Sequence, residues 1–161
     1  EDVVGCSAEA FRAKERQFHL DLKDAESVAY FEERIDICPG DPRAYYRMGS
    51  WWHAMEKYEK AMAYYDHAIS LNPAYSGVLR DRASLQAACR DPALRNGTAA
   101  LKDARMALEL ASSNNELDSE WIHRGYLQIL AAAHAECNDF ASAIAIQKEV
   151  LEKYCTTRRA N

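Results

Sequence analysis

The chain has 161 residues, 48% of them apolar and 28% charged, which is the composition of a soluble globular domain large enough to bury a core. Its net charge of -5 argues against a general nucleic-acid binder, because such proteins need a basic surface. No stretch approaches the ~20 apolar residues that a membrane-spanning helix needs. Only six glycines and four prolines occur, and alanine runs such as 131–133 favour helices over strands.

The first expected helical hairpin occupies residues 8–41. A helix over about 8–20 has a weak apolar pattern, and a second helix covers 25–33. Three positions of this second helix and its end recur 34 residues later, where Phe31, Ile35 and Pro39 correspond to Tyr65, Ile69 and Pro73. A period of 34 residues is typical of one class of helix-turn-helix repeat.

The clearest hairpin lies at residues 42–75. Asp41 is a good N-cap and Pro42 a good first residue, so a helix should begin there. A second helix should end near Leu71, because Pro73 cannot continue it and disfavours helix at the residue before it. Small residues at helical spacing are expected to let the two backbones approach closely: Gly49, Ala61 and Ala68.

Two further hairpins are expected at 76–114 and 118–154. In the longer loop of the third, Asp91 should cap a single turn starting at Pro92, and Gly97 should supply a positive backbone angle. Arg95 is expected to bond helix-end carbonyls or a nearby acid. In the fourth, Asn138 is expected in a left-handed turn.

The span 42–75 resembles a tetratricopeptide repeat (TPR) at nearly every signature position, including Gly49 and Pro73. The resemblance extends over about 24–154, and the loop Cys-x-Asp-Pro-x-x-Arg-Asn-Gly at 89–97 is similar to that of a bacterial TPR subclass. It implies an all-α fold, a right-handed α-solenoid of about four helical hairpins. The domain is then a single one over 1–161 with units of about 8–41, 42–75, 76–114 and 118–154, the first of them atypical.

The resemblance also implies a peptide-binding surface, the concave face, to which the first helix of each hairpin contributes. Carrying the family's ligand-facing positions onto this sequence gives Arg12, Arg16, Arg43, Tyr46, Ser50, His53, Arg80, Ser84 and Gln128. Such a surface is more basic than the protein as a whole, so an acidic peptide or the C-terminus of a partner protein is the expected ligand.

No catalytic signature is present: there is no nucleophile elbow, phosphate-binding glycine loop or metalloprotease motif. The five histidines are dispersed, and His134 is interpreted as a packing residue. We therefore expect no enzymatic activity, no metal and no cofactor. A catalytic role would require Tyr46, His53 and an acid to converge in one deep pocket.

Five cysteines at 6, 38, 89, 137 and 155 form no Cys-x-x-Cys pair, and the simplest interpretation is that they are small buried residues. Cys6 precedes the first helix and Cys38 ends its antiparallel partner, so a Cys6–Cys38 disulfide is expected if the protein is exported. Cys89 and Cys137 occupy equivalent places in successive repeats, too far apart to bridge.

The leading functional hypothesis is a protein–protein interaction scaffold that binds a partner peptide or helix on the concave face. The alternative is a self-associating assembly protein, a homodimer that uses an uncovered C-terminal helix carrying Ile144, Ile146, Val150 and Leu151. The sequence leaves the compartment open between the cytoplasm and an exported, periplasmic mature form.

Overall fold

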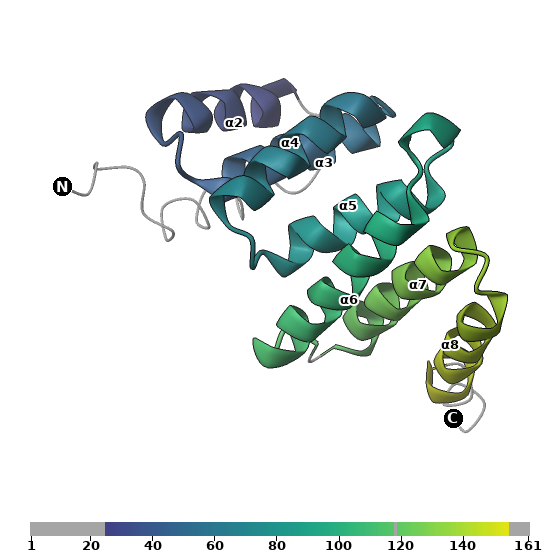
Figure 1. Ribbon diagram of the computed structural model, residues 1–161. Helices are drawn as coiled ribbons and strands as arrows, with labels where there is room; N and C mark the ends of the chain where they lie inside the picture. The colour runs from purple at the N-terminus through teal and green to yellow at the C-terminus, as the bar shows by residue number, and fades with distance from the viewer. Residues whose placement is uncertain (1–24, 118, 155–161) are drawn as a thin grey trace. The chain divides into compact units, whose positions relative to one another are not determined.

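The computed structural model describes residues 25–117 and 119–154, and within them the fold is all-α (Figure 1). In order along the sequence the elements are α2 (Ala25–Ile37), α3 (Pro42–Ala54), α4 (Tyr58–Leu71), α5 (Ser76–Ala88), the 3-10 turn η1 (Pro92–Leu94), α6 (Gly97–Ser113), α7 (Glu120–Glu136) and α8 (Phe140–Tyr154). The predicted fold class is confirmed, with helices packed against their neighbours as in a TPR-like solenoid. The helix expected over 8–20 lies outside the described residues.

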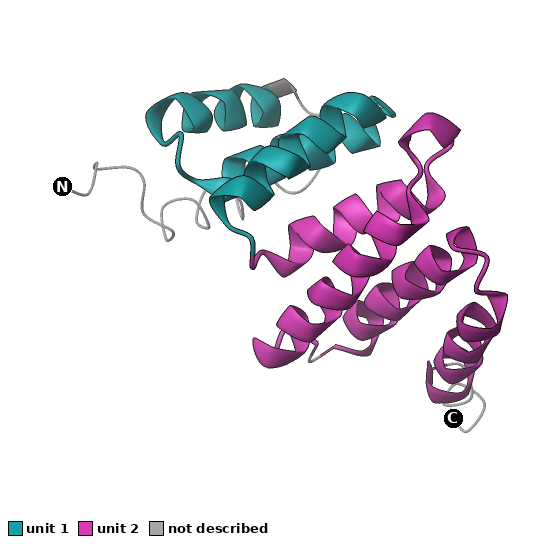
Figure 2. Cartoon of the chain, viewed as in Figure 1, with its two compact units in different colours: residues 1–73 teal, residues 74–161 magenta. Residues whose placement is uncertain are grey.

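The protein divides into two compact units, residues 1–73 and 74–161 (Figure 2). The first unit holds α2, α3 and α4, and the second holds α5 to α8. The division falls after Pro73, close to the predicted end of the second repeat at residue 75. The predicted single domain of four repeats remains a prediction.

The start of α3 follows from the sequence as expected. Asp41 is its N-cap, and the side chain accepts a hydrogen bond from the backbone N–H of Arg43. Pro42 occupies the first turn, where a missing N–H leaves no helical hydrogen bond unmade. α3 packs against both α2 and α4, and Phe31 of α2 meets Ala44 and Met48 of α3 in a buried cluster.

Close approach between α3 and α4 depends on Gly49. A Cβ atom there would lie 2.6 Å from two ring carbons of Tyr65 and 3.3 Å from the carbonyl oxygen of Ala61. Tyr65 is fully buried, so its ring has little room to move away. The prediction that small residues bring these two helices together is confirmed.

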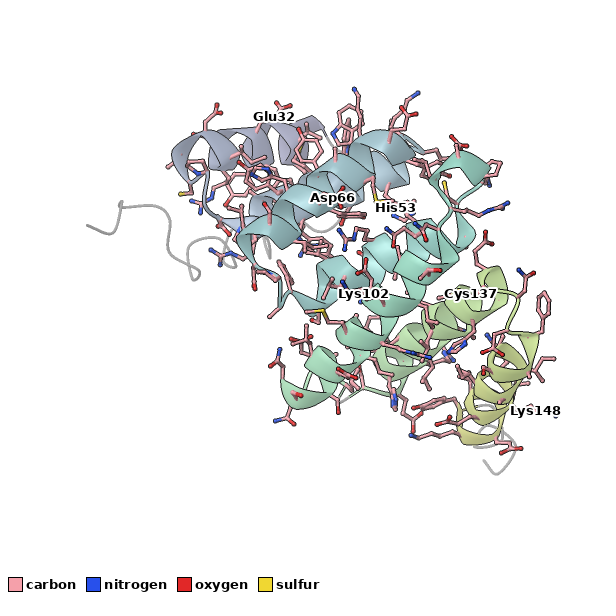
Figure 3. The ribbon with its side chains drawn as sticks, in the orientation of Figure 1. Glu32, His53, Asp66, Lys102, Cys137 and Lys148 are labelled. Atoms are coloured by element: carbon pink, nitrogen blue, oxygen red, sulfur yellow. The ribbon has the colours of Figure 1, made fainter. Side chains whose placement is uncertain are left out.

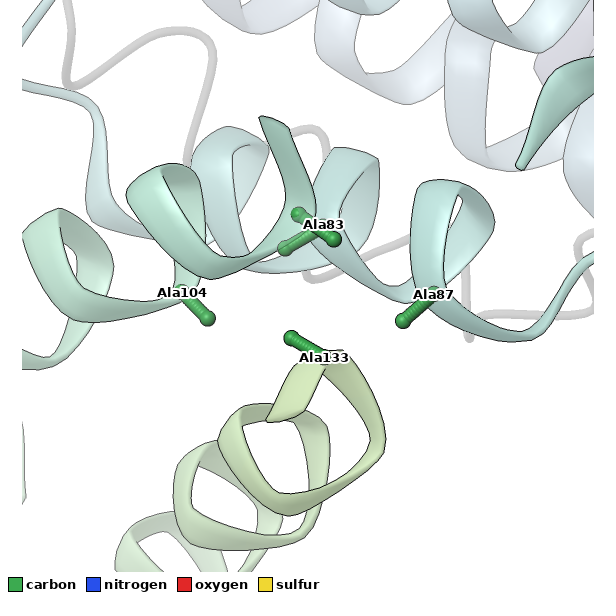
Figure 4. Close-up of a cluster of buried hydrophobic side chains, with 5 residues drawn as sticks. Ala83, Ala87, Ala104 and Ala133 are labelled. Carbon is green, nitrogen blue, oxygen red and sulfur yellow. The ribbon is translucent and has the colours of Figure 1, made fainter. Parts of the chain in front are cut away.

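In the second unit, three helices pack against one another through alanine side chains. Figure 4 shows Ala83 and Ala87 of α5, Ala104 of α6 and Ala133 of α7 converging on one buried cluster, which Ala100 of α6 completes. Because these side chains are small, α7 contacts α5 and α6 at once. Leu101 of α6 and Leu130 of α7 pack against the cluster and enlarge the core.

The structure confirms part of what the sequence predicts for the loop between α5 and α6. Asp91 caps η1 through the backbone N–H of Ala93, and Arg95 pairs with Glu136 at 3.3 Å. The expectation for Gly97 is wrong, because this residue does not adopt a positive φ angle. A Cβ atom on Gly97 would instead lie 2.9 Å from the backbone carbon of Glu136, so glycine lets the start of α6 touch the end of α7.

The turn between α7 and α8 is fixed by three neighbouring polar residues. Asn138 adopts φ 61°, the predicted left-handed conformation. Asp139 accepts a hydrogen bond from the backbone N–H of Ser142, in the first turn of α8, and its other oxygen lies 2.9 Å from Nδ1 of His134. His134 is buried, so its interpretation as a structural residue agrees with the geometry.

We expect Gly97→Ala to lower the free energy of unfolding by about 1–3 kcal/mol, because the new methyl group overlaps backbone that cannot move without separating α6 from α7. Gly125→Ala is the matched control in the same unit. Its Cβ atom would meet open space in α7, so this change should stabilise the protein by about 0.5–1 kcal/mol. Urea unfolding followed by circular dichroism measures both values. Equal stability of the two variants would contradict the proposed role of Gly97.

Candidate functional site

Four of the predicted ligand-facing residues form one stripe along α3. They are spaced by three and four residues, and they lie on the side of the helix opposite to the buried Ala44 and Met48: Arg43, Tyr46, Ser50 and His53. All four are partly exposed. Amphipathicity of α3 therefore keeps this stripe, which we call the α3 stripe, out of the core of the first unit.

The guanidinium of Arg43 is held by an acid of the same protein. Its Nε and Nη2 atoms donate to the two oxygens of Asp41, each at 2.8 Å, and Arg34 also donates to Asp41 at 3.4 Å. Burial by itself would raise the pKa of Asp41, but the hydrogen bonds and charge of Arg43, together with the hydrogen bond from Arg34, outweigh it and lower that pKa. Arg43 is therefore tied to the start of α3.

The other members of the α3 stripe are oriented by contacts within the first unit. Ser50 donates to the carbonyl of Tyr46 at 3.0 Å. His53 is labelled in Figure 3, and its Nδ1 atom lies 3.3 Å from the hydroxyl of Tyr65. The ring centroids of Tyr46 and Tyr65 are 6.2 Å apart. Sequence reasoning missed Tyr65 as a positioning residue, although its place opposite Gly49 was a usable signal.

The remaining predicted residues are distributed over the second unit and the N-terminal region. Arg80 on α5 donates to Asp81 at 2.8 Å, and its guanidinium lies 5.4 Å from the ring centroid of Tyr126. Ser84 is partly exposed on α5, and Gln128 is exposed on α7. Arg12 and Arg16 lie outside the described residues. Arg43 and Arg80 thus both engage neighbouring aspartates, and binding of an acidic ligand remains a prediction.

Sites of other kinds are not found in the described part of the protein. Within residues 25–117 and 119–154, no three His, Cys, Asp or Glu side chains come together as a metal ion would require. Among the described helices, none combines the length and apolar character needed to cross a bilayer.

Three of the cysteines are described. Cys38 is disulfide-bonded, while Cys89 and Cys137 carry free thiols, as expected for two sites too far apart to bridge. Cys6, the predicted partner of Cys38, lies outside the described residues.

Residues 42–75, which include α3 and α4, match the family model described as tetratricopeptide repeat. No curated protein matches the sequence. The hairpin that carries the α3 stripe is therefore similar to a tetratricopeptide repeat, and the match supports the interpretation of the whole as a TPR protein. The matched residues do not include the loop at 89–97, so its assignment to a bacterial subclass remains a prediction.

The pairing of Asp41 makes the stability of the first unit depend on pH. Its pKa in the folded protein is below the ordinary value of 3.8, so its contribution is complete above pH 3.8 and is lost as pH falls through the folded pKa. Asp41→Asn keeps an N-cap acceptor but removes the charge. We expect a loss of about 1.5–3 kcal/mol at pH 7, shrinking toward zero at acidic pH. Urea unfolding of the wild type and the variant at pH 7 and at a pH below 3.8 measures this loss. A difference in stability between the two proteins that does not depend on pH would contradict the ion pair.

Alkylation tests the cysteine assignment. In denaturant without reductant, Cys89 and Cys137 should react with iodoacetamide, whereas Cys38 should react only after reduction, because denaturant does not break a disulfide. Peptide mass spectrometry identifies the modified residues. Full modification of Cys38 before reduction would disprove the bond.

Proposed function

We propose that this protein is a protein–protein interaction scaffold that binds a segment of a partner protein on the surface of its first helices and catalyses no reaction. TPR hairpins generally mediate protein–protein interactions, and an all-helical repeat protein is typically a scaffold. The proposal places the central contact on the α3 stripe, within the hairpin that matches the repeat.

The observation that carries the proposal is the fixed orientation of two partly exposed aromatic side chains on α3. Tyr46 and His53 both contact Tyr65, which is fully buried and cannot rotate freely. Side chains ordered before binding lose less conformational entropy when a partner docks. Tyrosine also supplies both apolar area and a hydroxyl, which is why it is frequent at the centre of protein interfaces.

Hydrogen bonds within the protein reduce the contribution that two of the predicted arginines can make to partner binding. The expectation of an acidic ligand depends on arginines, yet Arg43 and Arg80 already donate to Asp41 and Asp81. A ligand carboxylate would have to share these guanidinium groups, which reduces the gain in free energy. We therefore propose that Tyr46 and His53 contribute most of the affinity, with Arg43 and Arg80 orienting the peptide or helix.

Affinity capture from a lysate of the source cells, followed by titration of the captured protein, tests this function. We expect Tyr46→Ala combined with His53→Ala to weaken the partner's affinity at least about ten-fold, in keeping with loss of two central contacts. Glu59→Ala is the control, because Glu59 is an exposed residue in the first turn of α4 within the same hairpin. Circular dichroism verifies that each variant folds.

Three results decide between surfaces. Loss of binding in the double variant alone supports the α3 stripe. Equal binding by wild type and both variants would remove the α3 stripe as the contact, and failure of the wild type to retain any protein would remove the scaffold function.

A further inference from the structure

An apolar groove of about 420 Å³ runs between α7 and α8 in the second unit. Alanines of α7 form one side of it, and large apolar residues of α8 form the other: Ala131, Ala132, Ala135, Phe140, Ile144 and Leu151. The three residues of α8 are 57%, 54% and 56% exposed, respectively. A contiguous apolar surface of this kind is a typical site of protein association.

The sequence predicts an uncovered C-terminal helix, and the structure refines which of its residues are exposed. Ile144 and Leu151 are exposed, as expected, and Phe140 joins them. Val150 is instead buried against Leu127, and Ile146 packs on the same cluster. α8 therefore has two apolar faces, one against the preceding helices and one open.

The open face has a covered counterpart in the same unit. Asn96 and Asp139 each accept a hydrogen bond from the backbone N–H three residues later, at the start of α6 and of α8. Aligning α8 with α6 on Asp139 and Asn96 gives an offset of 43 residues. With this offset, Ile144 corresponds to Leu101 and Leu151 corresponds to Leu108.

Leu101 and Leu108 are partly buried because α7 lies over α6. Leu101 packs against the alanine cluster that includes Ala133, and Leu108 packs against the cluster that includes Leu127, both of them residues of α7. The alanines of α7 likewise correspond to alanines of α5 when the two helices are aligned on their C-caps, Cys137 and Cys89. The α7/α8 groove is therefore lined by the same kinds of residues as the face of α5 and α6 that α7 covers. A helix with an apolar face would fit such a groove.

α8 itself presents such a face. Its open stripe consists of Phe140, Ile144, Gln147 and Leu151, spaced by four, three and four residues. This spacing reads the same in both directions, so two antiparallel copies would place each Phe140 opposite a Leu151 and each Ile144 opposite a Gln147. Such reciprocal pairing is what a two-fold symmetric interface requires.

We propose that two copies of this protein associate about a two-fold axis, with α8 of each copy lying in the α7/α8 groove of the other. The large side chains of one α8 then pack on the alanines of the other copy's α7, as the residues of α7 pack on α5 and α6. Figure 3 labels Lys148 on α8, a groove residue whose aliphatic stem borders the proposed interface.

Sedimentation equilibrium over a range of concentrations tests the pairing. The mass of the wild type should rise with concentration from 18.2 kDa toward about twice that value. Ile144→Glu should shift the midpoint to at least about ten-fold higher concentration, because a charge would be buried in an apolar interface. Met55→Glu is the control, since Met55 is also exposed (43%) but lies outside α8.

Mixing two variants tests the antiparallel register. Phe140→Lys and Leu151→Glu should each behave as a monomer alone, whereas their equimolar mixture should recover the dimer. In the mixture one Phe140–Leu151 pair is replaced by an ion pair and the other stays unchanged. Circular dichroism of each variant shows that the monomers are folded.

A wild-type mass that stays at 18.2 kDa at every concentration would overturn the proposal, as would a dimer unaffected by Ile144→Glu. If the monomer instead loses a captured partner on Ile144→Glu, the groove binds the helix of a different protein and self-pairing is wrong. None of these results bears on Tyr46 and His53, whose variants should change partner capture without changing the mass.

Discussion

Close contact between helix backbones is the constraint on which the rest of this structure depends. Gly49 brings α3 to within contact of the Tyr65 ring, and Gly97 brings the start of α6 against the end of α7. Within the second unit, alanines allow α5, α6 and α7 to meet at one cluster. Each unit contains only a few helices and has little interior, so its stability depends on how closely each helix approaches its neighbours rather than on a large central core.

The same contacts prepare the surface that is proposed to bind a partner. Tyr65 fills the space left by Gly49, and from there it reaches Tyr46 and His53 on α3. Packing and recognition are thus coupled through one buried ring. Charge has a more local role, because the Arg43 guanidinium fixes the first turn of α3 by bonding Asp41.

Repetition explains why apolar surface remains at α8. Each helix pair in the second unit presents a face to the next, and α7 covers the one formed by α5 and α6. The equivalent face of α7 and α8 keeps Ile144 and Leu151 exposed, although their counterparts on α6 are covered. At its last described hairpin, a helical repeat therefore leaves exposed an apolar face of the kind that is packed in its interior.

The sequence by itself determined the helices, since their boundaries follow from local chemistry: Asp41 caps, Pro42 starts a helix, and Asn138 tolerates a left-handed turn. It also identified the residues of the α3 stripe through spacing and family resemblance. Only the tertiary structure decided which neighbours these residues meet. The Arg95–Glu136 ion pair, the clash that excludes a side chain at Gly97, and the burial of Val150 on α8 all depend on how separate segments pack, and periodicity within one helix carries no information about that.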